Sequence, residues 1–192
     1  MTTTLSIIGT AGRKIPDGCH LTKALFERMV AAVDAKISDL HPEGTSNLTL
    51  VSGGAAVVDH IAVVLYLTGR FAGLTLYMPA PFNFKTCRYV DNGNTKWTMN
   101  PGHVSNHWFD KFNTIMGRRN MAEDIKLAFE MGAHLDIGEG FHSRNAQVAA
   151  SDEVIACTWG TDAPDDGGTL DTWKKIKAGR KKYHISLRSL FV

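Results

Sequence analysis

Three short apolar segments of the chain are each followed by a glycine-rich turn, and this repetition constrains the fold more than any other feature. The segments cover residues 5–9, 48–51 and 152–158, and the turns have the sequences GTAGR, SGGA and DDGGT. Apolar runs of this length, separated by helical patterns, are typical of parallel strands that are buried on both faces. Because right-handed crossovers connect parallel strands, we expect all three turns at the same edge of one sheet.

The remaining segments complete an alternation of strands and helices. Thr22 is expected to cap a first helix, which His41 and Pro42 end. Further helices are predicted at residues 57–68, 105–116, 120–131, 144–150 and 170–178, and further strands at residues 74–78, 134–137 and 183–187. The predicted fold class is therefore α/β: a Rossmann-like, doubly wound, mostly parallel sheet with helices on both faces.

Length and composition indicate one domain that spans residues 1–192. The chain is 44% hydrophobic and 21% charged, which is ordinary for a globular protein with a substantial core. Residues 81–120 interrupt the alternation with aromatic residues, asparagines and cations, and an insertion of this length is usually a functional lid or an oligomer contact. The net charge of +2 is too small to suggest that the protein coats nucleic acid.

The sequence also favours a cytoplasmic protein without a membrane segment. Its three cysteines are scattered, and the N-terminal residues lack the pattern of a signal peptide. The chain contains no apolar run of the roughly 18 residues that a membrane span needs. Cys157 lies in a predicted buried strand and is expected to be a small core residue.

The glycine turns predict an anion-binding site. Backbone N–H groups at the start of a helix attract phosphate or carboxylate, because unpaired donors and the helix dipole both face the anion. Three such turns with Arg13 and Arg144 nearby favour a nucleotide or a sugar phosphate as the ligand. The predicted ligand-binding residues of the turns are Gly9, Thr10, Gly12, Arg13, Ser52, Gly53, Gly54, Gly167, Gly168 and Thr169. Arg118 and Arg119 are expected to add phosphate contacts from the insertion, and Asn145 to contribute beside Arg144.

The segment FHSRNAQVAASDEVIACTWG, from Phe141 to Gly160, resembles the arginine segment of the Lonely Guy family, which comprises cytokinin-activating phosphoribohydrolases. The family's pattern M-H-x-R-K-x-x-M-A-x-x-A-D-x-x-I-A-L matches directly at His142, Arg144 and Ala149. With one residue deleted after Ala149, the pattern also matches Asp152, Ile155 and Ala156. Asn145 stands in place of the family's lysine.

A second segment is similar to the same family. The family's turn P-G-G-x-G-T-L-E-E resembles residues 168–172, which keep its glycine, threonine, leucine and first acidic residue, whereas a loop displaces the leading proline and glycine. The resemblance implies that Arg144 corresponds to the catalytic arginine and Asp171 to the catalytic glutamate. It further implies hydrolysis of the N-glycosidic bond of a nucleoside 5′-monophosphate by a homo-oligomer, expected to be a dimer, without a cofactor.

The second glycine turn resembles a different family. SGGA followed by Asp59 and His60 is similar to the motif SGGA-x-G-I-D-x-x-A-H of DNA-processing protein A, and Arg144 with Asn145 resembles its R-N-R segment. Both families belong to the SLOG superfamily of Rossmann-like nucleotide binders. The superfamily resemblance covers the sheet scaffold, about two thirds of the chain, and leaves out the insertion.

The side chains themselves are suited to glycosidic cleavage. The reaction develops oxocarbenium character on the sugar, which a carboxylate such as that of Asp171 stabilises while it orients or deprotonates water. An arginine holds phosphate or ribose in a bidentate manner. Structural roles are the alternative: Asp171 and Asp59 as first-turn acids, Arg144 as an ion-pair partner and His60 as a packed histidine. His103 and His107 have a metal-binding spacing without a clear third ligand, so no metal site is predicted.

Three functions compete at this point. The leading hypothesis is a nucleotide-processing N-glycosidase in which Arg144 and Asp171 carry catalysis. The first alternative is a non-catalytic binder of a nucleotide-derived ligand, motivated by the replacement of glutamate by the shorter Asp171 and by the altered turn. The second alternative is a single-stranded DNA binder similar to DNA-processing protein A, which the low net charge disfavours.

Overall fold

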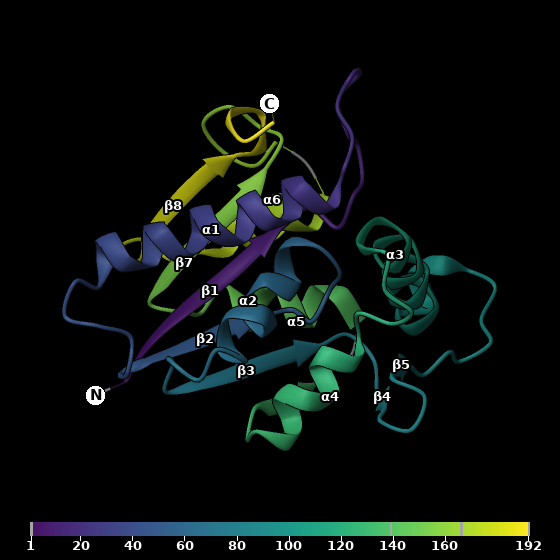
Figure 1. Cartoon of the computed structure of the whole chain (residues 1–192). Helices are drawn as coiled ribbons and strands as arrows, with labels where there is room; N and C mark the ends of the chain where they lie inside the picture. Colours follow the sequence, from purple (N-terminus) through teal and green to yellow (C-terminus); the bar gives the residue numbers. More distant parts are fainter. Residues whose placement is uncertain (1, 139, 166, 192) are drawn as a thin grey trace.

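The protein contains a six-stranded, all-parallel sheet flanked by helices on both faces (Figure 1). The computed structural model describes residues 2–138, 140–165 and 167–191. The strands of the sheet are β1 (Thr3–Gly9), β2 (Leu48–Ser52), β3 (Gly73–Met78), β6 (His134–Ile137), β7 (Glu153–Thr158) and β8 (Lys181–Ser186), in the order β6-β3-β2-β1-β7-β8. The doubly wound α/β fold predicted from the sequence is confirmed.

The chain changes direction across the sheet at β1. From β1 it proceeds outward through β2 and β3 to β6, and it then returns to place β7 on the other side of β1, followed by β8. Ile7 of β1 is in register with Ile155 of β7, and Leu5 is in register with Leu50 of β2. The strand order therefore reverses between β1 and β7, and open α/β sheets bind ligands outside the carboxyl ends of the strands at such a switch point.

The reversal places the helices on opposite faces of the sheet, because a right-handed crossover in the other direction lies on the other face. The first face carries α1 (Lys23–Leu40), α2 (Val58–Tyr66) and α4 (Glu123–Glu130), and the second carries α5 (Gly140–Val148) and α6 (Gly167–Lys175). Successive strand residues point to alternate faces. Leu5 and Ile7 accordingly join the larger core of the first face, whereas Ile8 joins the smaller core of the second.

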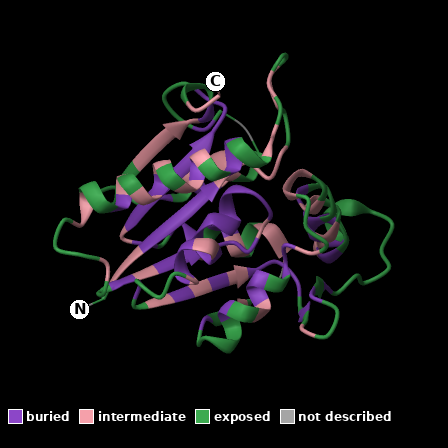
Figure 2. Cartoon of the chain, in the orientation of Figure 1, coloured by how far each residue is buried: buried purple, intermediate pink, exposed green. Residues whose placement is uncertain are grey.

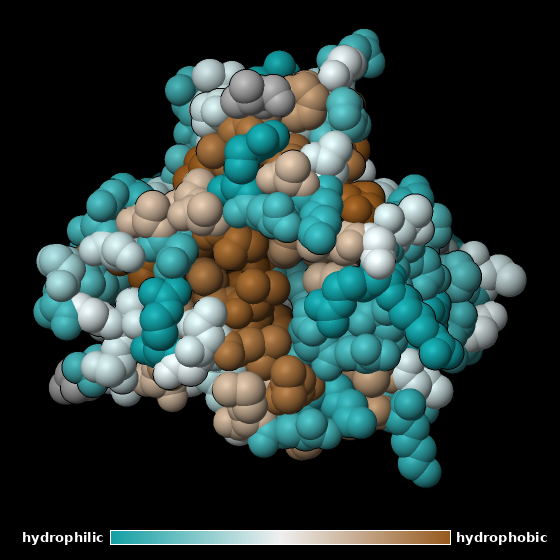
Figure 3. All heavy atoms as spheres, in the orientation of Figure 1, coloured by the Kyte–Doolittle hydropathy of each residue, from teal (hydrophilic) through white to brown (hydrophobic). Residues whose placement is uncertain are grey.

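The helices of the first face form where the sequence predicted them. Thr22 caps α1, because its hydroxyl accepts a hydrogen bond from the amide of Leu25 at 3.0 Å. The helix α2 is buried along nearly its whole length, as expected from its apolar sequence (Figure 2). Val64 of α2 and Leu67, which directly follows the helix, are only partly buried. Figure 3 shows an apolar strip over the region where α2 lies between α1 and α4.

The insertion folds into a compact unit beyond the carboxyl ends of the central strands (Figure 1). It contains a two-stranded hairpin, β4 (Phe82–Asn83) and β5 (Arg88–Tyr89), the short 3₁₀ helix η1 (Trp97–Met99) and the helix α3 (Pro101–Met116). The hydroxyl of Tyr89 donates to the carbonyl of Gly54 at 2.5 Å, and Phe109 and Phe112 pack against the ring of His60. These contacts attach the insertion to α2 and to the turn before it.

Most element boundaries agree with the sequence prediction to within a few residues, and three helices begin earlier than predicted. The helix α5 begins at Gly140 instead of residue 144. The helix α3 begins at Pro101 instead of residue 105, since Asn100 caps it by accepting from the amide of His103 at 3.1 Å. The helix α6 begins at Gly167 instead of residue 170. The chain ends in a second 3₁₀ helix, η2 (Leu187–Ser189). In the described part of the chain, no helix combines the length and apolar character needed to cross a membrane.

Candidate functional site

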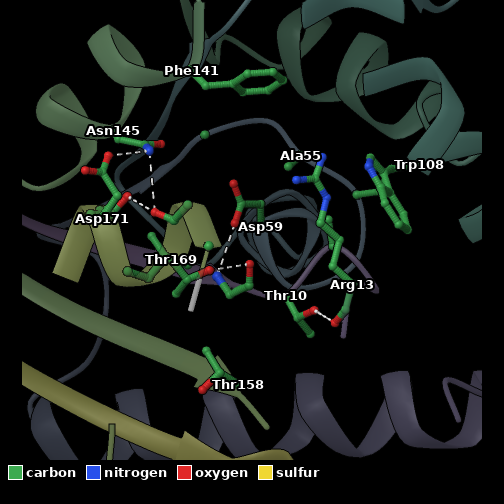
Figure 4. Close-up of a pocket in the computed structure, with 18 of the residues that line it drawn as sticks. Thr10, Arg13, Ala55, Asp59, Trp108, Phe141, Asn145, Thr158, Thr169 and Asp171 are labelled. Atoms are coloured by element: carbon green, nitrogen blue, oxygen red, sulfur yellow. Dashed lines mark hydrogen bonds between the residues drawn. The ribbon is translucent and has the colours of Figure 1, made fainter. Parts of the chain in front are cut away.

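A cavity of about 770 Å³ opens beyond the carboxyl ends of β1 and β7, at the point where the strand order reverses. Its walls come from the turns after β1, β2 and β7, from the starts of α5 and α6, and from the insertion (Figure 4). Ten of the residues predicted to form the site line it: Gly9, Thr10, Arg13, Gly53, Arg144, Asn145, Gly167, Gly168, Thr169 and Asp171. The expectation that the three turns share one edge of the sheet is confirmed.

Four polar side chains in this cavity form a continuous chain of hydrogen bonds. The Nη1 group of Arg144 donates to Oδ2 of Asp59 at 3.2 Å, and its Nε donates to Oδ1 of Asn145 at 3.1 Å. The Nδ2 group of Asn145 then donates to Oδ2 of Asp171 at 2.9 Å. Arg144 and Asp171 therefore do not pair directly, and Asn145 connects them. We call these four residues the acid–arginine chain.

Glycine allows close packing at two turns that line the cavity. A Cβ atom on Gly53 would lie 2.1 Å from Nη1 of Arg144, which instead donates to the carbonyl of Gly53 at 2.9 Å. A Cβ atom on Gly9 would lie 2.3 Å from the carbonyl oxygen of Cys157 and 2.5 Å from the side chain of Val58. The close approach of the Arg144 guanidinium to the β2–α2 turn thus requires glycine at position 53.

Asp59 is the buried member of the acid–arginine chain. Its side chain is only 8% exposed, and burial raises the pKa of its carboxyl group above the usual value. The Arg144 guanidinium and the amides of Ala55, Gly9 and Gly53 act in the opposite direction by stabilising the charged form. Asp59 lines the cavity, so a group with a raised pKa faces the ligand space.

Asp171 lies in the contrasting environment. Its side chain is 35% exposed, and its Oδ2 accepts hydrogen bonds from Nζ of Lys175 at 2.7 Å and from Asn145. The hydrogen bond from Lys175, and after it the one from Asn145, lowers the pKa of Asp171 below its usual value. Two carboxyl groups whose pKa values are shifted in opposite directions thus belong to one cavity, an arrangement typical of acid–base sites.

The start of α6 is held against the end of β1. The hydroxyl of Thr169 donates to the carbonyl of Gly9 at 2.8 Å, and the Asn145 amide lies 3.4 Å from the carbonyl of Gly168. A threonine at this point of the sequence also predicts a hydroxyl cap for the helix, and this prediction is wrong, because α6 begins at Gly167 and the Thr169 hydroxyl instead connects α6 to β1. Asp166, which belongs to the same predicted turn, lies outside the described residues.

The insertion supplies an aromatic wall. The guanidinium of Arg13 lies 5.2 Å from the ring centroid of Trp108 and 5.5 Å from that of Trp97, and both tryptophans line the cavity. On the sheet side, the ring of Phe141 lies 5.6 Å from the guanidinium carbon of Arg144. Figure 4 shows Phe141 and Trp108 approaching the same space from different elements.

Five predicted site residues do not line the cavity. Arg118 makes a bidentate pair with Asp124, at 3.0 and 2.9 Å, and Arg119 is exposed away from the cavity wall. The prediction that these two arginines add phosphate contacts to this site is therefore not supported. Gly12, Ser52 and Gly54 lie behind the lining and shape the turns: Gly12 and Gly54 have positive φ values of 98° and 66°, and the Ser52 hydroxyl donates to the carbonyl of Asp59 at 2.8 Å.

From the sequence, Asp59 is interpretable as a first-turn acid, and the aromatic residues of the insertion are expected to belong to a lid or an oligomer contact. The position of Asp59 depends on a partner 85 residues away in the sequence, which no local pattern reveals. The available signal was the SGGA motif, which includes this aspartate. The expectation for His60 is confirmed, since it is fully buried and packs against Phe109 and Phe112.

The histidine pair of the insertion lies apart from this cavity. Nδ1 of His103 is 3.0 Å from Oδ2 of Asp91, and Asp110 makes a bidentate pair with Arg88. Among the residues that the structure describes, no group of three or more histidine, cysteine or acidic side chains is arranged to hold a metal ion.

The chain is 35% identical over 178 residues to a protein of Acanthamoeba polyphaga mimivirus that carries the name "Uncharacterized protein R261". The match covers 92% of this chain and 92% of the viral protein. The chain belongs to the family of that protein. The name of the viral relative states no activity. No protein-family model and no solved structure matches the chain.

Proposed function

We propose that this protein is an N-glycosidase that acts on a nucleoside monophosphate or a related nucleotide, on a scaffold of the SLOG type. The observation that carries the proposal is the acid–arginine chain, which brings two carboxyl groups with opposite pKa shifts into one cavity at the switch point of the sheet. Glycine turns and a helix start surround the same space, as expected for a phosphate ligand.

The ligand would be held at three points. Its phosphate would bind at the start of α6, where Gly167 and Gly168 line the cavity and the helix dipole favours an anion. Its base would stack on an aromatic ring of the wall such as that of Phe141, which lies 5.6 Å from the guanidinium carbon of Arg144. The sugar would then lie beside Asp171, with its C1′ atom toward the carboxylate.

In the reaction, the bond between C1′ and the base nitrogen breaks as a water oxygen bonds to C1′. The electron pair of the broken bond leaves with the base, the sugar gains the hydroxyl group of the water, and the base gains the remaining proton of that water after it has passed through Asp171. The Asp171 carboxylate, kept ionised by Lys175 and Asn145, stabilises the positive charge that develops on the sugar and accepts the proton of the attacking water. Asn145 and Lys175 act as positioning residues, because they restrict the carboxylate to one place.

The two residues that depart from the Lonely Guy pattern, Asn145 and Asp171, contact each other in the structure. Asp171 is shorter than the family's glutamate, and a misplacement near 1 Å costs about a hundredfold in rate. Asn145, which stands where that family has lysine, contacts Asp171 at 2.9 Å, and the cation comes instead from Lys175 at 2.7 Å. Asn145 and Asp171, the two replaced residues, are thus hydrogen-bonded to each other, and Lys175 donates to the same carboxylate. This arrangement supports a catalytic role for the shorter Asp171.

The backbone after β2 supports the superfamily assignment. The motif SGGA-x-G-I-D has glycine at the position of Val57, and Val57 adopts a φ of 66°. This conformation is rare for a β-branched residue and easy for glycine. The aspartate of the motif corresponds to Asp59, the buried member of the acid–arginine chain.

A non-catalytic nucleotide binder is the second candidate, and one observation favours it. The Arg144 side chain is only 11% exposed and already binds Asp59, Asn145 and the carbonyl of Gly53. Less of its hydrogen-bonding capacity then remains for a substrate. A single-stranded DNA binder is less favoured, because basic side chains near the C-terminus are paired: Lys175 with Asp171, Arg180 with Asp152 and Lys181 with Glu153.

Base release decides between these functions. The purified protein is incubated with a panel of nucleoside monophosphates and dinucleotides, and free base is followed by chromatography. We expect release by the wild type and a decrease of about 10²- to 10⁴-fold in Asp171→Asn. Asp39→Asn, an exposed change on α1, is the matched control and should keep full activity. If the protein retains an intact nucleotide and releases no base, the non-catalytic binder is favoured over the glycosidase. Salt-dependent binding of oligonucleotides would favour the DNA-binding alternative.

A further inference from the structure

The cavity continues beyond the acid–arginine chain to a second, chemically distinct end. In Figure 4, Asn145 and Asp171 lie on one side of the space, Arg13 and Trp108 lie on the other, and Asp59 lies between them. Lining residues on the second side come from the turn after β1 and from the insertion. The glycosidase chemistry proposed above uses only the first side.

The second end combines cations with indole rings. The guanidinium of Arg13 lies within 5.5 Å of the ring centroids of both Trp97 and Trp108, and Nζ of Lys111 lies 4.6 Å from that of Trp108. Arg188, from the C-terminal 3₁₀ helix, also lines the cavity, and its Nε donates to the carbonyl of Trp159 at 2.9 Å. Guanidinium groups recognise phosphate oxygens, and indole rings stack on nucleobases.

Trp97 is unusually accessible for a residue of this size. It lies in η1 at 55% exposure while it lines the cavity, so its ring adds little to the core of the insertion. A large aromatic side chain that faces a ligand space beside a cation is typical of binding surfaces. The second end therefore places aromatic surface beside a cation, a combination that suits a flat group next to a negatively charged one.

We propose that the ligand of this cavity is a dinucleotide, in which two nucleoside units are joined by a diphosphate. One unit binds at Asp171 with its phosphate at the start of α6, the second phosphate lies near Arg13, and the second base stacks on the ring of Trp97 beside Trp108. The volume of about 770 Å³ lies in the upper part of the range of about 300–1,000 Å³ for small-molecule sites, which suits a ligand larger than a mononucleotide. The statement that the unit at Asp171 reacts rests on the proposed function. The binding of a dinucleotide across both ends of the cavity does not.

Binding of a graded series of probes tests the inference. The series consists of AMP, ADP, ADP-ribose and NAD⁺, titrated calorimetrically into the Asp171→Asn variant so that the probes stay intact, which chromatography afterwards verifies. We expect ADP to bind more tightly than AMP, because the second phosphate reaches Arg13, and NAD⁺ to bind at least about tenfold more tightly than AMP.

Two variants locate the second base. Trp97→Ala should weaken NAD⁺ binding by about tenfold, the effect of losing one stacked base, and leave AMP binding within about twofold. Met99→Ala is the matched control, since Met99 belongs to the same 3₁₀ helix, is 56% exposed and does not line the cavity. Arg13→Gln should weaken ADP, ADP-ribose and NAD⁺ alike and spare AMP.

Equal affinities for AMP and NAD⁺, or an equal loss of both in Trp97→Ala, would overturn the dinucleotide inference. Because these titrations measure binding of intact probes, they are independent of base release. Tight NAD⁺ binding without base release by the wild type would contradict the glycosidase and keep the dinucleotide site. Base release from AMP together with equal affinities for AMP and NAD⁺ would keep the glycosidase and contradict the dinucleotide site.

Discussion

Replacing Gly53 by alanine tests the packing on which the acid–arginine chain depends. The new Cβ atom would lie 2.1, 2.6 and 2.7 Å from Nη1, Cζ and Cδ of Arg144, distances at which the arginine must move. The φ angle of Gly53 lies outside the left-handed region, so alanine adds no backbone strain. The substitution therefore acts through one neighbouring side chain.

The expected cost follows from the contacts that Arg144 would lose. A hydrogen bond to a charged group contributes about 1.5–3 kcal/mol, and breaking a buried ion pair costs about 3–5 kcal/mol. Asp59 would still accept the hydrogen bond from the amide of Gly9 at 3.3 Å, and burial already favours its neutral form. We therefore expect a cost near the lower limit of the range for a broken ion pair. We predict that Gly53→Ala lowers the free energy of unfolding by about 3 kcal/mol.

A double-mutant cycle isolates this cause. Unfolding in urea is followed by circular dichroism for the wild type, Gly53→Ala, Arg144→Ala and the double variant. In the Arg144→Ala background the clash is absent, and Gly53→Ala should change the free energy of unfolding by less than about 1 kcal/mol. Gly73→Ala is the matched control, because its Cβ would meet only Thr49, at 3.4 Å or more. An equal cost of Gly53→Ala in both backgrounds would refute the reasoning.

Two further predictions concern the charge of Asp171 and the attachment of the insertion. The hydrogen bond from Lys175 lowers the pKa of Asp171 in the folded protein below the usual value of 3.8. The ionised carboxylate therefore stabilises the fold above pH 3.8, and this contribution is lost as the pH falls through the lower pKa of the folded state. For the same reason, the acidic limb of the kcat/KM profile should lie below pH 3.8. Lys175→Met should move that limb upward and the exposed neighbour Lys174→Met should not, and identical limbs in all three proteins would contradict the assignment. Tyr89→Phe should lower the free energy of unfolding in urea by about 1–3 kcal/mol, because the buried carbonyl of Gly54 loses its donor, and an unchanged value would show that this hydrogen bond does not hold the insertion.

The sheet could be predicted from the sequence because its signals are local. Each strand is a short apolar run that ends at a turn, and even the edge strand β6, with only two strongly apolar residues, has the predicted bounds of residues 134–137. The hydroxyl of Thr22 marks the start of α1 within a few residues of sequence. Parallel pairing then brings the three glycine turns to one edge without further information.

The partners within the site could be predicted only in part, because they depend on long-range contacts. Arg144 and Asp171 were identified from motif resemblance, but their connection through Asn145 and the pairing of Arg144 with Asp59 arise from tertiary packing. Arg118 has the composition of a phosphate ligand and instead binds Asp124, six residues along the chain. The strands of the β4–β5 hairpin have two residues each, too few for a period to be recognised.

Hydrolysis in water enriched in oxygen-18 tests the proposed reaction most directly. The wild-type protein is incubated with a nucleotide that it cleaves or, if none is yet known, with AMP and NAD⁺, and the products are analysed by mass spectrometry. N-glycosidic hydrolysis predicts that the heavy oxygen appears on C1′ of the released sugar phosphate and is absent from the base. It also predicts that Asp171→Asn lowers the rate at which the labelled product forms by about 10²- to 10⁴-fold. Label found on phosphate instead, or no labelled product from any nucleotide, would contradict the proposed function.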